Sequence, residues 1–327
     1  MKLNHWFYAV VVLCCMPLKC WALSGFTVHL PPENAYLESE RVGIVLNVEN
    51  VVLSSIRVVG GKNDTTEIQV SAAVPTLCFA VSLNHGLNVI ELLGINQGKV
   101  VAQRSVKIFS KSVLDSSSRF QPTGFEPYVF HVEAREQACV ACHDMNPTLS
   151  DLRPSDPVKS PCFSCHQRKR VIAFNHNPAT QWNCFACHEV LDEQRKYTVP
   201  DPEQQMCDPC HHKEMKSWNA SQVVHGPTAV GHCTICHDPH GSDRPGILRM
   251  QTTDLCINCH DDKASGAHVI AGFYGQGHPV RGVKDPFKPE REFTCAGCHD
   301  PHAGDTLNLL RHDNANMMEY CTRCHEI

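Results

Sequence analysis

Hydrophobic and polar positions alternate in short stretches along the first third of the chain. Apolar and β-branched residues recur after residue 25 in the segments VGIVLNV, SSIRVVG, TEIQVSA, LCFAVSL, LNVIELLGI and VVAQRSVKIF. Turn-forming residues separate these segments, among them Gly60-Gly61 and Asn84-His85-Gly86. About seven strands in roughly 90 residues are typical of an immunoglobulin-like (Ig-like) β-sandwich. We therefore predict an all-β Ig-like sandwich over residues 23–112.

Three residues of this region have side chains that often carry chemistry. Cys78 stands among apolar neighbours, so we interpret it as a small buried hydrophobic residue. His29 and His85 are interpreted as surface or turn residues rather than ligands. The last two strand segments resemble the final hairpin of bacterial Ig-like modules in their pattern, although no diagnostic motif supports the resemblance.

The first residues have the pattern of a secretory signal. Lys2 precedes an apolar run from Trp6 to Leu18, and Cys20-Trp21-Ala22 provides a cleavage site. We predict residues 1–22 to be a signal peptide and the protein to be exported, to the periplasm or outer cell surface of a bacterium. A membrane anchor is the weaker alternative, because a span needs about 20 apolar residues. A lipoprotein is also disfavoured, because no small residue precedes a cysteine of this segment.

The pattern changes near residue 112. Residues 113–130 are rich in Ser, Pro and Gly and are predicted to be a linker. From residue 139 onward there is little sustained period of two or of 3.6, and Pro, Gly, Asp and His are frequent. The apolar residues of this part are too scattered to offset the entropy of ordering the chain. Something other than side chains must therefore supply the core of residues 131–327.

Cysteine is the exceptional component of this part. The chain has 20 Cys and 21 His, and the pattern Cys-x-x-Cys-His occurs eight times after residue 138. The paired cysteines are Cys139 and Cys142, Cys162 and Cys165, Cys184 and Cys187, Cys207 and Cys210, Cys233 and Cys236, Cys256 and Cys259, Cys295 and Cys298, and Cys321 and Cys324. The histidines that follow them are His143, His166, His188, His211, His237, His260, His299 and His325.

This spacing suits covalent attachment of c-type haem. Cysteines three residues apart lie on one side of a helical turn, where both sulfurs reach the vinyl groups of one haem. The histidine directly after them is then placed to bind the iron as proximal ligand. Zinc ribbons also use paired cysteines, but they do not require a histidine after each pair. We therefore predict eight covalently bound haem c groups and reject zinc and a disulfide framework.

The motifs themselves repeat in pairs. The first cysteines of a pair of motifs are 23 residues apart in three cases and 26 in the last. The chain resembles the doubled Cys-x-x-Cys-His family of multihaem c-type cytochromes, here as an octahaem domain of four di-haem modules over residues 131–327. The resemblance implies a haem-packed fold of short helices and loops. It also implies electron transfer in bacterial respiration, with other redox proteins or outer-membrane complexes as partners.

Ten histidines of this part lie outside the motifs and could be distal ligands. His131, His176 and His225 each precede a module by eight residues, and His278 is the counterpart in the last module. His240 and His302 stand three residues after a motif histidine, too close to reach the far face of the same haem, so each would bind a neighbouring haem. We predict as distal ligands His131, His176, His225, His278, His212, His240, His302 and His268. His232 and His312 are reserves, and Met145, in the segment Cys-His-Asp-Met-Asn, leaves open a His/Met haem.

The predicted function follows from this ligation and from charge. Bis-histidine iron has no open position, which favours an electron carrier over an enzyme. Without residues 1–22 the formal charge goes from −5 to −7, and eight haems with ionised propionates bring it to about −15 oxidised and −23 reduced. No basic block suggests nucleic acid, and nothing past the signal could span a membrane. A multihaem reductase with one open haem and a subunit of a self-associating cytochrome filament remain alternatives.

Overall fold

A computed structural model describes residues 25–49, 52–62, 65–71, 73–112, 114, 122–148, 156–166, 172–189, 196–264, 278, 280–311 and 317–326. The predicted signal segment, His268 and His312 lie outside the described residues. The chain divides into two compact units. The first contains Met1–Ala35 and Glu40–Ser110, and the second contains Tyr36–Ser39 and Lys111–Ile327.

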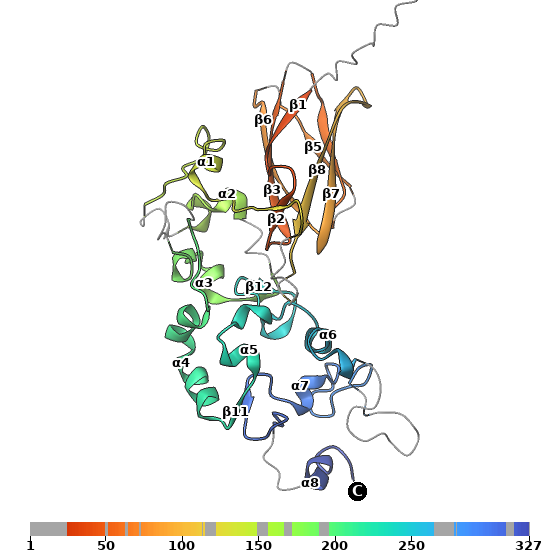
Figure 1. Cartoon of the computed structure of the whole chain (residues 1–327), viewed down its shortest axis with the longest axis vertical. Helices are drawn as coiled ribbons and strands as arrows, with labels where there is room; N and C mark the ends of the chain where they lie inside the picture. Colours follow the sequence, from red (N-terminus) through yellow and green to blue (C-terminus); the bar gives the residue numbers. More distant parts are fainter. Residues whose placement is uncertain are drawn as a thin grey trace, which may run out of the picture. The chain divides into compact units, whose positions relative to one another are not determined.

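The first unit consists of antiparallel strands in two sheets (Figure 1). The smaller sheet has the order β1-β3-β6, formed by Phe26–Leu30, Arg41–Val48 and Thr76–Ser82. The larger sheet has the order β5-β4-β7-β8, formed by Thr65–Gln69, Ser55–Val59, Gly86–Asn96 and Lys99–Ser110. Two short strands that lie mostly in the second unit, β2 (Ala35–Leu37) and β9 (Glu126–Pro127), pair with each other. The predicted β-rich N-terminal region is confirmed, and the sheet order is consistent with the predicted Ig-like sandwich.

The core of this unit is built by the period of two along its strands. Ile44 and Leu46 of the smaller sheet and Ile56, Ile90 and Leu92 of the larger sheet are fully buried. Alternate residues point to one face of a strand, so these side chains form the inner layer. Burial of each such side chain contributes about 1.5–3 kcal/mol. This unit therefore has a hydrophobic core made of its own side chains.

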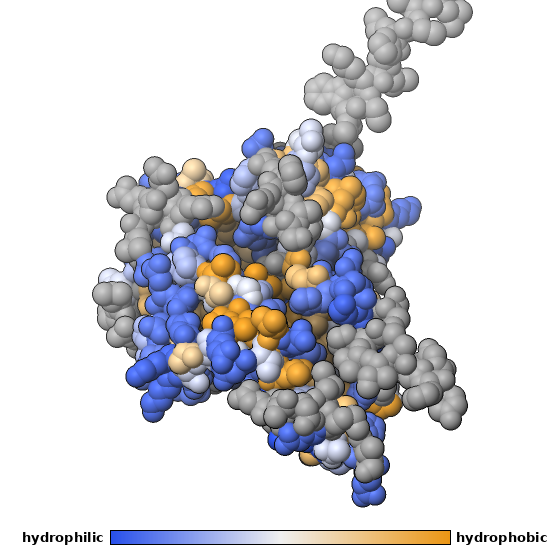
Figure 2. All heavy atoms as spheres, turned by 60° about the horizontal axis from the view of Figure 1, so that its bottom comes forward, coloured by the Kyte–Doolittle hydropathy of each residue, from blue (hydrophilic) through white to orange (hydrophobic). Residues whose placement is uncertain are grey.

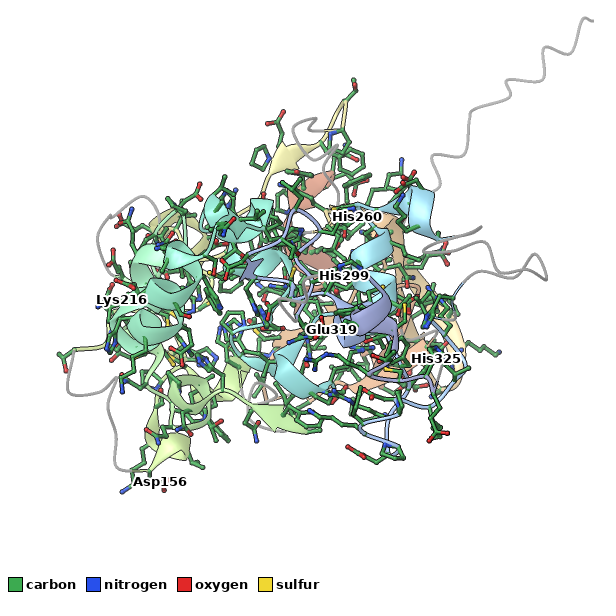
Figure 3. The ribbon with its side chains drawn as sticks, turned by 90° about the horizontal axis from the view of Figure 1, so that it is seen from below. Asp156, Lys216, His260, His299, Glu319 and His325 are labelled. Atoms are coloured by element: carbon green, nitrogen blue, oxygen red, sulfur yellow. The ribbon has the colours of Figure 1, made fainter. Side chains whose placement is uncertain are left out.

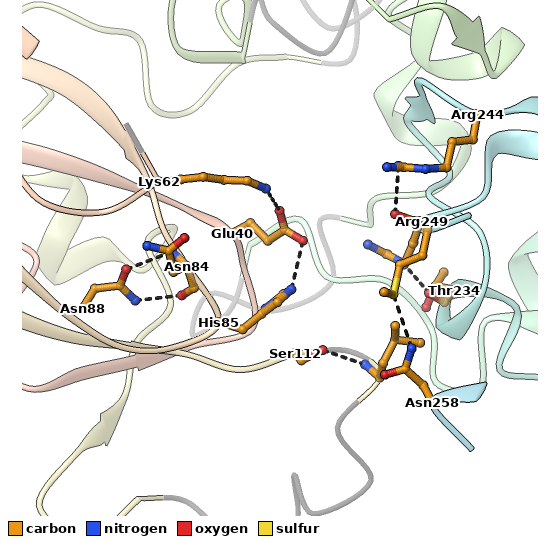
Figure 4. Close-up of polar contacts among 12 residues, drawn as sticks. Glu40, Lys62, Asn84, His85, Asn88, Ser112, Thr234, Arg244, Arg249 and Asn258 are labelled. Atoms are coloured by element: carbon orange, nitrogen blue, oxygen red, sulfur yellow. Dashed lines mark hydrogen bonds and ion pairs between the residues drawn. The ribbon is translucent and has the colours of Figure 1, made fainter. Parts of the chain in front are cut away.

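One expectation for this unit is wrong. Cys78 is exposed, whereas Val81 on the same strand is buried. The alternation of β6 explains the difference, because residues an odd number apart point to opposite faces. His29 and His85 are exposed, as interpreted, and His85 lies 3.5 Å from Glu40, which also pairs with Lys62 (Figure 4).

The second unit has short elements connected by turns (Figure 1). Its α-helices are α1 (Glu133–Glu136), α2 (Phe163–His166), α3 (Asn177–Thr180), α4 (Gln204–Ala220), α5 (Gly226–Ala229), α6 (Thr252–Ile257), α7 (Cys295–Cys298) and α8 (Met317–Cys321). Its 3-10 helices are η2 (Pro157–Lys159), η4 (Cys184–Ala186), η5 (Cys233–Ile235), η6 (Pro245–Ile247) and η7 (Asp261–Lys263). The longest described helix, α4, contains Pro209 and departs from helical geometry at His211. A proline inside a helix removes a hydrogen bond and causes such a kink.

Two small strand pairs each join the segment just before one module to a segment inside the following module. Strand β10 (Phe174–Asn175) pairs with β12 (Gly241–Ser242). Strand β11 (Val223–Val224) pairs with β13 (Ala303–Gly304) in the same manner. The backbone therefore connects each of these modules to its successor through an equivalent two-residue bridge.

The second unit buries few apolar side chains. Among described residues from 122 to 326, the buried hydrophobic residues are Tyr128, Cys139, Trp182, Met215, Phe293 and Ala303. Large apolar side chains reach the surface instead, such as Val158, Phe287 and Leu307. Hydrophobic groups lie between hydrophilic ones on the face that Figure 2 draws. The described helices include none with the length and apolar character needed to cross a membrane.

Candidate haem-binding sites

Each Cys-x-x-Cys-His motif forms about one helical turn. We number the motifs in chain order as sites 1 to 8, from Cys139–His143 to Cys321–His325. At seven sites the backbone N–H of the histidine donates to the carbonyl of the first cysteine, over 2.9–3.2 Å. Site 4 lies within α4. This turn places both cysteines on one side of the backbone, as attachment of one macrocycle requires.

The motif histidines of sites 3, 5 and 7 are held by one repeated hydrogen bond. Nδ1 of His188, His237 and His299 donates to the carbonyl nine residues later, at 2.8, 2.7 and 2.6 Å. These carbonyls belong to Tyr197, Gly246 and Asn308. A bond at Nδ1 fixes the ring orientation and leaves Nε2 free to bind iron.

The histidines that precede the modules lie opposite the second motif histidine of their own module. Ring centres are 6.3 Å apart for His131 and His166, 6.2 Å for His176 and His211, and 6.1 Å for His225 and His260. In the last module the ring centres of His278 and His325 are 6.2 Å apart. The same relation therefore recurs at sites 2, 4, 6 and 8.

The histidines of the two Cys-His-Asp-Pro-His segments lie opposite the first motif histidine of the preceding module. His240 faces His188 of site 3, with ring centres 6.1 Å apart. His302 faces His237 of site 5 at 6.0 Å, and it also stacks on Trp218 at 4.3 Å. A segment that carries one attachment site thus offers an imidazole to a site in the module before it.

The common spacing of these six pairs fits two imidazoles on one iron. Each imidazole places its ring centre about 3.15 Å from the iron, which is an iron–nitrogen bond of about 2.0 Å plus roughly 1.15 Å from nitrogen to ring centre. Two imidazoles on opposite faces of one iron therefore have ring centres about 6.3 Å apart. The observed 6.0–6.3 Å matches this sum. The donor set therefore fits covalently attached haem with a histidine on each face.

Among the described residues, no ring contact joins His212 or His232 to a motif histidine. His212 lies exposed on α4. His232 faces Glu203, with 3.4 Å between Nδ1 and Oε2. Asn146, not Met145, has the position of His240 in its own module, and the Met145 carbonyl accepts a hydrogen bond from Lys196. Among the described residues, ring contacts therefore assign no distal histidine to His143.

Successive sites contact each other through their cysteines. In the free-thiol form, before haem attachment, the Cys184 thiol donates to Cys162, which lowers the pKa of Cys162 to about 6 and raises that of Cys184. Equivalent hydrogen bonds join sites 4 and 5 and sites 6 and 7, through Cys207 and Cys233 and through Cys256 and Cys295. Electrostatic interactions join the two sites within each module, through Cys139 and Cys165, Cys187 and Cys210, Cys236 and Cys259, and Cys298 and Cys324. The order of the sites in space therefore follows their order in the chain.

Burial favours the neutral form of several candidate ligands. It lowers the pKa of His225, His237 and His302, although the hydrogen bonds that these imidazoles donate to backbone carbonyls or to Asp300 oppose the effect. Iron binds the neutral imidazole, so this environment favours ligation.

Two arginines that sequence reasoning missed anchor the attachment turns. Nε of Arg249 donates to the Thr234 carbonyl at 2.6 Å, and Nε of Arg311 donates to the Ala296 carbonyl at 2.5 Å. Figure 4 shows Arg249 with Thr234, and Arg244 bonded to the Arg249 carbonyl. The repeat in the sequence could have indicated these two arginines, because both stand 16 residues after the first cysteine of their module.

Buried donors without a partner in the described region also fit haem. They include Trp182 Nε1 and Arg244 Nε. An unpaired buried donor is costly, and haem propionates are acceptors that could satisfy it.

No group of three or more His, Cys, Asp or Glu side chains gathers as metal ligands in the described residues. Figure 3 labels His260, His299 and His325, three motif histidines of the C-terminal half.

Comparisons with known proteins agree with these sites. Residues 225–265 and 287–326, which contain sites 5 to 8, match the doubled CXXCH motif family. The multiheme cytochrome MtrA of Shewanella baltica (strain OS185) is 25% identical over 200 residues, 58% of this chain and 52% of that protein. Both matches support a multihaem c-type cytochrome. They indicate covalently bound haem c. The chain spans about half the length of this curated relative.

A structural comparison gives a weaker likeness. Fibronectin(III)-like modules of Clostridium thermocellum CbhA align with 27% of this chain and 97% of their own, at 15% identity and a TM-score of 0.22. At that score the alignment carries no argument about fold. The description of the fold rests on the sheet order itself.

Proposed function

We propose that this protein is an exported octahaem cytochrome that conducts electrons along a row of bis-histidine haems, in the periplasm or at the cell surface. The eight motifs attach the haems, and the motif histidines bind the irons on the proximal side. The six histidine pairs supply the distal ligands of sites 2, 3, 4, 5, 6 and 8. His212 and His268 remain the candidates for sites 1 and 7.

The observation that carries this proposal is the recurring spacing of six histidine pairs, whose ring centres lie 6.0–6.3 Å apart. The backbone also bridges successive modules, through the pairing of β10 with β12 and of β11 with β13. Haems attached at neighbouring sites would lie close enough for electrons to pass between them. Because distal histidines from one module serve the module before it, the protein would hold adjacent haems in a fixed relation.

Ligation on both faces favours conduction over catalysis. Where an imidazole occupies each face, the iron exchanges an electron but offers no position to a substrate. Full reduction also adds eight negative charges, so the potentials should spread over a wide range. The first unit, which has its own core, would serve as a docking module for a redox partner.

Film voltammetry of the matured protein tests this function. We expect reversible exchange of eight electrons over a broad range of potential. Addition of nitrite, hydroxylamine or sulfite should leave the current unchanged. A catalytic current with any of them would overturn the carrier and favour a reductase. Cell fractionation with haem staining and surface proteolysis tests the location independently.

A further inference from the structure

The distal histidine of site 2 has a hydrogen-bond partner unlike those at sites 4 and 6. Nδ1 of His131 lies 3.0 Å from Oε1 of Glu136. At site 4, Nδ1 of His176 donates instead to the Pro239 carbonyl at 2.9 Å. At site 6, His225 bonds to the carbonyl of Pro301. The repeat therefore uses a neutral carbonyl twice and a carboxylate once.

Glu136 is held rigidly in a buried position. Only 2% of the residue is exposed, and its second oxygen lies 2.6 Å from Nζ of Lys196. That ammonium also donates to the Met145 carbonyl at 3.2 Å and to Asn146 Oδ1 at 2.7 Å. A buried carboxylate persists only when paired and hydrogen-bonded, and Lys196 supplies this pairing.

The other carboxylates beside distal histidines differ in their environment. Asp238 lies 3.0 Å from His240 and Asp300 lies 3.5 Å from His302, but their side chains are 28% and 31% exposed. Solvent weakens such a contact, whereas burial strengthens it. Glu136 therefore provides the least solvated charged acceptor among these three contacts.

We propose that Glu136 is a positioning residue that orients His131 and lowers the reduction potential of the haem at site 2 relative to sites 4 and 6. A charged acceptor at Nδ1 makes the imidazole a stronger donor to the iron, and a stronger donor stabilises the ferric state. The second haem from one end of the row would then be a low-potential step. This inference rests on the proposed ligation of site 2 by His131 and His166.

The test compares redox titrations of full-length matured variants. Glu136→Gln keeps the shape of the side chain and removes its charge. We expect one-eighth of the haem absorbance change to move to higher potential by at least tenfold in the ferric/ferrous equilibrium, about 59 mV for a one-electron couple. Glu133→Gln, an exposed position on the same helix, is the matched control and should leave the curve unchanged.

A double-mutant cycle separates a bond through His131 from a general effect of charge. In a His131→Met background, Glu136→Gln should no longer shift the titration. If Glu136→Gln lost haem, Glu136→Asp would replace it, with a smaller shift of the same sign. A Glu136→Gln curve that overlays the Glu133→Gln curve, or a shift that persists in the His131→Met background, would overturn the inference. Absence of any titrating haem band would instead contradict the proposed function.

Discussion

Replacement of His302 by alanine should open one haem and leave the others unchanged. His302 faces a single motif histidine, His237, at 6.0 Å between ring centres. Its loss should therefore convert one of the eight haems, at site 5, from low spin to high spin. The module bridge should survive, because the bond from the His225 N–H to the His302 carbonyl and the pairing of β11 with β13 involve only backbone.

The same change also removes an aromatic contact. The His302 ring stacks on Trp218 at 4.3 Å and 12° between planes. Aromatic pairs of this kind contribute about 0.5–1.5 kcal/mol beyond their buried area. We expect the thermal midpoint to fall, because this contact and one iron ligand are both lost, with haem content unchanged at eight. Differential scanning calorimetry would measure the fall.

Carbon monoxide titration of the reduced protein is the assay. His302→Ala should bind one more equivalent than the unaltered protein. His232→Ala is the control, because His232 faces Glu203 rather than a motif histidine. An unchanged stoichiometry in His302→Ala, or an equal gain in His232→Ala, would refute distal ligation by His302.

Three further predictions follow from the attachment turns and the haem row. Replacement of Cys207 and Cys210 by alanine should reduce haem content from eight to seven. The stopped-flow rate of electron transfer from one end of the haem row to the other should fall by more than one-eighth, because site 4 lies in the middle of the row. Arg249→Gln should lower stability by about 1.5–3 kcal/mol in calorimetry through loss of its bond to the Thr234 carbonyl, and an equal effect of Arg323→Gln at the exposed surface would contradict this. Protein made without haem attachment should keep a protease-resistant fragment near residues 25–110 while the rest is digested, since the buried apolar residues concentrate there; resistance of the second unit would count against haem as its core.

The sequence predicts those parts of the fold that have a local cause. Strands β3 to β8 follow the alternation of apolar residues, as in Val42, Ile44 and Leu46. Strands β1 and β2 were not among the predicted segments, because the pairing of β1 is irregular between Val28 and Leu30 and β2 has only three residues. Cys78 was misplaced, because apolar neighbours on both sides do not reveal which face of a strand is buried.

Candidate ligands follow from spacing, but their partners do not. The sequence indicates that His240 binds outside its own site, and only the fold shows His188 opposite it. The counterpart of His240 in the second module is Leu191, so the repeat offers no such partner to site 1. Glu136 gives no sequence signal at all, because its role depends on contact with Lys196, 60 residues later.

Intact mass spectrometry of the matured protein, with the absorption spectrum after dithionite, tests the central claim most directly. The account predicts the mass of the processed polypeptide plus eight haems and a sharp red-region band. The mass of the bare polypeptide, with no such band, would contradict it.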